Sequence, residues 1–156
     1  MAIRCTMLTL LAATLFGVIA CKPEGPPNYA LMRLRHAETH FEMLIMMETF
    51  GEGMCEAALS EFTRAIYENE ADMEGWKETE RDCREVLKPL YTKIFNDEQV
   101  HATYLTISAE EGWGYESRIV LYGIPASQAQ PVCEEIAHDL QSKLEARTEC
   151  VQGTEG

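Results

Sequence analysis

Two histidines and two methionines recur at helical spacing in the first third of the chain. Placed at 100° per residue, His36, His40, Met43 and Met47 fall within about 60° of one another on a helix. Histidines four residues apart can share a metal ion, and thioethers favour soft Cu(I). The spacing therefore predicts a Cu(I) site on this face. The alternative is that the two methionines pack in the core, where methionine is an adaptable filler.

Catalytic motifs are missing from the sequence. There is no G-x-S-x-G, no glycine-rich phosphate loop and no H-E-x-x-H, because the run from His36 to His40 has the wrong spacing. Cys133 and His138 are five residues apart on a predicted helix and would face different directions. We therefore expect a non-enzymatic role and no catalytic residue.

An acidic, glycine-flanked loop carries two aromatic residues. Residues 110–115 read Glu-Glu-Gly-Trp-Gly-Tyr, which places Trp113 and Tyr115 at the tip of a predicted hairpin. Tryptophan and tyrosine often anchor protein interfaces. These two side chains are candidates for contact with a protein or a glycan, and the alternative is that Trp113 folds back over the domain.

The N-terminus reads as an export signal. Arg4 precedes sixteen uncharged, mostly apolar residues from Cys5 to Ala20, a run too short for a typical membrane-spanning helix but suited to a cleaved signal peptide. It ends in Val18-Ile19-Ala20-Cys21, which resembles the lipobox of bacterial lipoproteins over the first 21 residues.

That resemblance implies removal of residues 1–20 and lipidation of Cys21, with palmitate-type acyl chains inserted into the lipid bilayer. Residues 21–28 contain three prolines and would form a semi-rigid tether to one globular domain, residues 29–156. Lys22 follows the cysteine where family members retained at the inner membrane often have aspartate. The resemblance thus favours the outer membrane, facing the periplasm.

The number of cysteines and the net charge indicate which disulfides the mature domain can form and which partners it can bind. Cys55, Cys83, Cys133 and Cys150 would remain, and an even number in an exported domain predicts two disulfides. The full chain has a formal charge of −13, and loss of Arg4 makes it one unit more negative. Such acidity argues against nucleic-acid binding and allows a basic protein partner.

Hydrophobic periodicity predicts an α+β domain, predominantly helical, with about four helices and one antiparallel β-hairpin. No internal repeat is apparent. The expected helices cover 29–50, 52–69, 72–94 with a restart at Pro89, and a segment after Pro125 to about 147; the hairpin strands cover 101–108 and 115–124.

The predicted helices leave the disulfide pairing open. Cys55 and Cys83 would lie opposite each other in a helical hairpin. Cys133 and Cys150 would be about 25 Å apart along a straight helix, too far for a bond, so crossed pairs are slightly preferred.

These features lead to three functional hypotheses. The first is a membrane-anchored accessory or protein-binding lipoprotein, and an immunity protein against a basic toxin is one concrete version. The second is a periplasmic lipoprotein that handles Cu(I) through the His/Met face. The third, which the sequence favours least, is an envelope enzyme. Beyond the lipid on Cys21 and this possible copper ion, no cofactor is expected.

Overall fold

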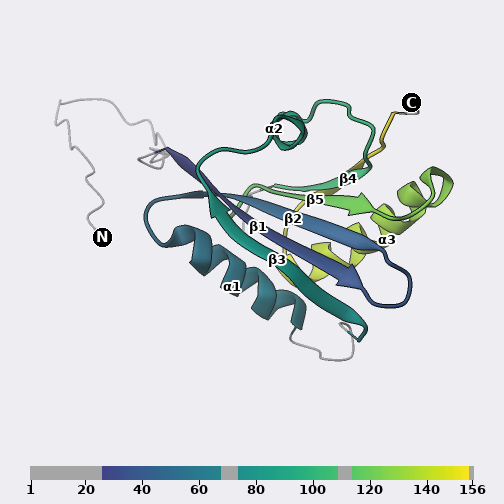
Figure 1. Ribbon diagram of the computed structural model, residues 1–156, viewed down its shortest axis with the longest axis horizontal. Coiled ribbons are helices and arrows are strands. Elements are labelled where there is room, and N and C mark those ends of the chain that lie inside the picture. Colours follow the sequence, from purple (N-terminus) through teal and green to yellow (C-terminus); the bar gives the residue numbers. More distant parts are fainter. Residues whose placement is uncertain (1–25, 68–73, 109–113, 155–156) are drawn as a thin grey trace, which may run out of the picture.

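A six-stranded antiparallel sheet, with order β3-β1-β2-β5-β4-β6, forms the centre of the protein. The computed structural model describes residues 26–67, 74–108 and 114–154 (Figure 1). The elements in chain order are β1 (Pro27–His36), β2 (Glu42–Phe50), α1 (Met54–Tyr67), β3 (Trp76–Arg84), α2 (Pro89–Phe95), β4 (Tyr104–Ile107), β5 (Ser117–Tyr122), α3 (Ala126–Leu144) and β6 (Thr148–Val151).

The expectation of a predominantly helical domain with one hairpin is wrong. The segment 29–50 forms the β1–β2 hairpin instead of a helix, with Leu34 opposite Met43. Both strands lie inside the sheet, and their central residues, 30–32 and 44–47, are apolar and buried without alternation. A continuous apolar run of this kind also fits a buried helix, and periodicity cannot separate the two.

The segment 76–84 was also wrongly expected to be helical. It forms β3, an edge strand in which half-buried and exposed residues alternate along its whole length. Pro89 does begin a helix, the short α2, as the predicted restart implied. The helix within 52–69, the hairpin of β4 and β5, and the helix after Pro125 are confirmed.

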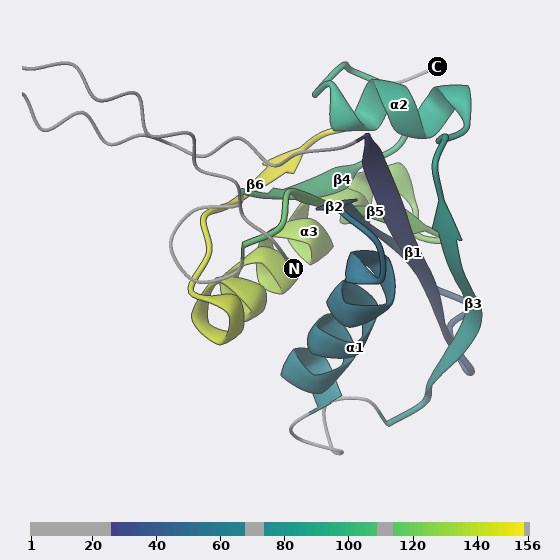
Figure 2. The ribbon, with the colours of Figure 1, turned by 90° about the vertical axis from the view of Figure 1, so that its left-hand side faces the viewer.

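The two halves of the domain repeat one topology. In each half a hairpin is followed by a helix and then by a strand that pairs with the first strand of the hairpin, as β1-β2-α1-β3 and β4-β5-α3-β6. The halves meet at the antiparallel pair of β2 and β5. Both helices pack on one face of the sheet, and α2 covers part of the other (Figures 1 and 2). Sequence similarity does not reveal this duplication.

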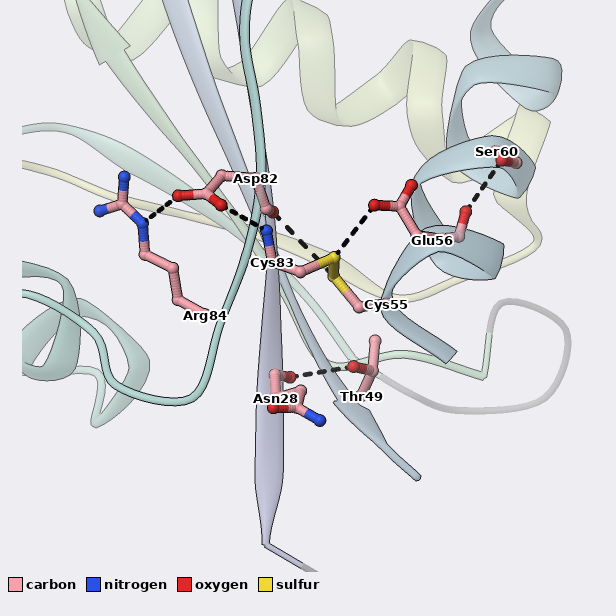
Figure 3. Close-up of a disulfide and its surroundings, with 8 residues drawn as sticks. All are labelled: Asn28, Thr49, Cys55, Glu56, Ser60, Asp82, Cys83 and Arg84. Atoms are coloured by element: carbon pink, nitrogen blue, oxygen red, sulfur yellow. Dashed lines mark hydrogen bonds and ion pairs between the residues drawn. A yellow bond between two sulfur atoms is a disulfide. The ribbon is translucent and has the colours of Figure 1, made fainter. Parts of the chain in front are cut away.

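Each half contains one disulfide that joins its helix to its last strand. Cys55 of α1 is bonded to Cys83 of β3, and Cys133 of α3 to Cys150 of β6, with Cα atoms 6.0 Å apart in both pairs. Figure 3 shows the first bridge, next to Glu56. The slight preference for crossed pairs is therefore wrong. Because α3 ends at Leu144 and Glu145 takes a left-handed conformation, the chain turns back and brings Cys150 beside Cys133.

Candidate functional site

An apolar groove runs between α1 and α3 above the sheet. It encloses about 400 Å³, within the size range of ligand-binding clefts. Figure 2 shows the two helices side by side on the same face of the sheet. The lining residues are Leu34, Phe41, Met43, Ile45, Phe62, Ile66, Trp76, Ile119, Val132, Glu135, Ile136, Asp139, Leu140 and Lys143.

Two sequence periodicities build the groove. Met43 and Ile45 are two residues apart on β2, so both point to the helix-bearing face, where they line the floor. Val132, Ile136 and Leu140 recur every four residues on α3 and form one wall. Phe62 and Ile66 of α1 form the other wall by the same spacing.

Aromatic rings close one end of the groove. Trp76 packs edge-on against Phe41, with the ring centroids 5.4 Å apart. Trp76 makes a similar edge-on contact with His36, also at 5.4 Å between ring centroids. The contacts arise because His36, at the end of β1, pairs with Trp76, at the start of β3. Half-buried aromatic rings at the mouth of a cleft are suited to anchoring an incoming apolar group.

Charged residues of α3 lie along the rim. Glu135 and Asp139 are exposed, and Lys143 is bonded to Asp139 with Nζ 2.9 Å from Oδ2. The rim therefore carries a net negative charge. An apolar ligand with a basic flank would match both the walls and the rim.

The structure places the four predicted metal ligands in different surroundings, although Met43 and Met47 lie on the same face of β2. Met47 is fully buried and Met43 lies in the floor of the groove. His36 packs on Trp76, and its Nδ1 lies 3.3 Å from the backbone N of Thr39. His40 is in the turn after β1, with its Nδ1 near Arg35. The His/His/Met/Met face required a helix that does not form.

Of the predicted partner-binding pair, one residue is described. Tyr115 packs against the core under α1, and its hydroxyl donates a hydrogen bond to Glu61 at 3.2 Å. Burial, and after it the negative charge of Glu61, raises the pKa of Tyr115. Tyr115 is thus half-buried and helps to hold α1 in position, and its contact with a partner stays a prediction. Trp113 lies outside the described residues, as do Cys21 and the lipobox.

Sequence reasoning missed the groove because it assigned Trp76 and Phe41 to helices. The segment from Trp76 to Arg84 is polar except at Trp76 and Cys83, so its sequence has no period-2 alternation that would indicate a strand, and the alternation appears only in the burial of its side chains. Pairing of that strand with β1 is what brings Trp76 to Phe41.

The opposite face of the sheet holds a buried arginine. Arg118 of β5 is 5% exposed, forms ion pairs with Asp97 and Glu116, and lies over the ring of Phe95. Glu48 of the neighbouring strand lies close to this cluster. Burial, and after it the charge of Glu116, raises the pKa of Glu48, against the opposing effects of Arg118 and a hydrogen bond from Tyr29.

Within the described parts of the chain, no three His, Cys, Asp or Glu side chains are grouped as metal ligands require. No helix of those parts has the length and apolar character needed to cross a bilayer.

Comparisons with protein families, with curated proteins and with solved structures find no match to this chain.

Proposed function

We propose that this chain is a lipid-anchored envelope lipoprotein whose domain binds a protein partner and catalyses no reaction. The anchor is Cys21, at the end of the lipobox Val18–Cys21. Two disulfides within one domain support export to an oxidising compartment. Lys22 supports sorting to the outer membrane, with the domain in the periplasm.

The observation that carries the proposal is the groove between α1 and α3. Its apolar walls and aromatic end suit an apolar segment, and its acidic rim suits basic residues beside that segment. The strongly negative formal charge of the chain extends this complementarity over the domain and would speed encounter with a basic partner. An immunity protein that neutralises a basic periplasmic toxin would have these properties.

Site-specific cross-linking in cells tests where the partner binds. The photo-reactive residue p-benzoylphenylalanine replaces Val132 in the groove wall or, as a matched control, exposed Gln141 on the same helix. We expect a cross-link from position 132 to a basic protein, lost when Trp76→Ala is added, and no such product from position 141. An acidic product, or equal cross-linking from both positions, would refute the groove as the partner site.

The anchor has its own test. Metabolic labelling with palmitate should mark the full chain, and Cys21→Ser should abolish the label while residues 21–156 remain in the periplasm. A full chain that is exported without lipid would contradict the lipoprotein assignment and leave the groove proposal standing.

The Cu(I) alternative gains no support from the arrangement of the four predicted ligands. Nδ1 of His36 lies within hydrogen-bond distance of the backbone N of Thr39, and Nδ1 of His40 lies near Arg35. Met47 is fully buried in the core. Titration of the soluble Cys21→Ser domain with Cu(I) checks it directly. Binding tighter than micromolar, lost in His36→Ala, would restore copper handling as the function.

A further inference from the structure

Two large apolar side chains are exposed next to the short helix α2. Val86 in the segment before α2 is 78% exposed and Leu90 in its first turn is 43% exposed. Tyr91 and Ile94 of the same helix are buried and attach it to the sheet. α2 is therefore firmly packed on one side and presents apolar side chains on the other.

The same segment is basic within an acidic protein. Residues 86–95 contain Lys88 and Lys93 and no acidic residue, and both lysines are exposed. The Lys88 ammonium lies 5.9 Å from the centre of the Tyr91 ring. We call Val86, Lys88, Leu90 and Lys93 the α2 tip. Apolar side chains bordered by lysines are typical of surfaces that rest in the headgroup region of a bilayer.

The α2 tip lies beside the point where the chain enters the domain. Tyr29, near the start of β1, contacts Phe95 at the end of α2 with ring centroids 5.3 Å apart. Tyr29 also pairs with Arg84, the last residue of β3, directly before the segment that leads to α2. Figure 2 shows α2 next to the beginning of β1.

We propose that the α2 tip rests on the bilayer to which Cys21 is anchored, with its lysines on anionic lipid headgroups. This inference rests on the proposed lipid anchor. The chain from Cys21 to Pro27 spans at most about 20 Å when extended, so the anchor holds this end of the domain near the membrane. Lysines near an anionic surface and apolar groups in the interface then add favourable contacts.

This orientation directs the groove away from the membrane. β1 runs from Pro27, at the tether, to His36, whose partner Trp76 is part of the aromatic end of the groove. Ten residues of strand cover about 33 Å. The aromatic end of the groove therefore lies away from the bilayer, in the aqueous compartment, where a soluble partner can reach it.

Chemical protection of lysines tests the contact without any substitution in the domain. The full lipidated chain is reconstituted in vesicles of phosphatidylethanolamine and phosphatidylglycerol and acetylated with a membrane-impermeant reagent. The reference is the soluble Cys21→Ser domain. We expect several-fold slower acetylation of Lys88 and Lys93 in vesicles and an unchanged rate at Lys77, an exposed lysine at the far end of β3. Equal rates at Lys88 and Lys93 in both states would overturn the proposal.

Depth-dependent fluorescence quenching provides a second measurement. Leu90→Trp places an indole in the α2 tip, and Glu38→Trp places one in the exposed turn between β1 and β2 as the matched control. After subtraction of the parent protein's emission, lipids brominated on their acyl chains should quench the tryptophan emission of Leu90→Trp and leave that of Glu38→Trp unchanged. Equal quenching of the two overturns the proposed orientation.

The mass of the reconstituted chain separates this inference from the anchor. A chain that carries lipid but shows neither protection nor quenching refutes the contact of the α2 tip and leaves the anchor intact. A chain that carries no lipid refutes the anchor, and with it the inference.

Discussion

The indole of Trp76 lies edge-on against the ring of Phe41, with the ring centroids 5.4 Å apart. Trp76 begins the edge strand β3, whereas Phe41 directly precedes β2. The contact forms because β1 lies between these strands and pairs with both. One end of the candidate site therefore depends on the geometry of a strand that enters the sheet at its edge.

The glycine before Trp76 should be essential for that contact. Gly75 has a φ of +83°, and a Cβ there would come within 2.8 Å of Nε2 of His36, which packs on Trp76. Gly75→Ala therefore combines backbone strain with displacement of a packed ring. Gly53→Ala is a matched control, because Gly53 has a φ of +75° with no atom within 4 Å of the added carbon.

We expect Gly53→Ala to lower the free energy of unfolding by about 1–2 kcal/mol through strain alone. Gly75→Ala should cost more and should also shift tryptophan emission, since the surroundings of Trp76 change. Denaturant unfolding monitored by fluorescence measures both effects. Equal losses with unchanged emission would show that His36 does not restrict position 75.

The disulfide pairs can be checked chemically. Digestion without reduction should yield peptides joined through Cys55–Cys83 and through Cys133–Cys150, and no crossed pairs. Replacing either pair by serine should lower stability by about 2–4 kcal/mol. The loss should be slightly larger for the first pair, whose sequence separation is 28 against 17. A crossed peptide would contradict the pairing of β6 with β4.

Glu48 should make stability depend on pH. Its pKa is raised in the folded protein, chiefly by burial and next by Glu116, so the folded state binds the proton more tightly than the unfolded state. The stabilising contribution is fully present below the unfolded pKa and is lost as the pH rises through the folded pKa. The ionised form of Glu48, with its negative charge, is thus the form that the fold disfavours.

Glu48→Gln removes that charge and keeps the size of the side chain. We expect a gain in the free energy of unfolding of about 0.5 kcal/mol at pH 7, and the gain should vanish below pH 4. The exposed Glu85→Gln is the control and should show no comparable gain. Thermal unfolding of both variants across this pH range measures the change in stability. A gain that persists at low pH would contradict the electrostatic cause.

Binding of a neutral apolar dye reports on the groove independently of any partner. N-phenyl-1-naphthylamine should bind the soluble Cys21→Ser domain with enhanced fluorescence. Ile136→Glu puts a charge into the apolar wall, and we expect affinity to fall by about tenfold or more because burial of an unpaired charge is costly. Gln141→Glu, on the exposed side of α3, should leave the affinity unchanged. Equal effects of the two substitutions would place the dye elsewhere.

Local sequence patterns were sufficient to predict several of the helices and strands and the number of disulfides. The i, i+4 spacing of apolar residues indicated α1, Pro125 and the residues after it indicated α3, and the β-branched segments near Tyr104 and Val120 indicated a hairpin. An even number of cysteines indicated two disulfides. These features depend on side chains close together in sequence, so the sequence alone carries the information.

Only the tertiary structure decided the sheet and the groove. Residues 30–32 and 44–47 are apolar without alternation because sheet neighbours and packed layers surround them, and such runs do not distinguish a helix from two strands. Long-range pairing of β1 with β3 and of β2 with β5 set the position of Trp76 and the two faces of the sheet. The lipobox, in contrast, is a local signal read directly from residues 18–21, and it stays a prediction from sequence.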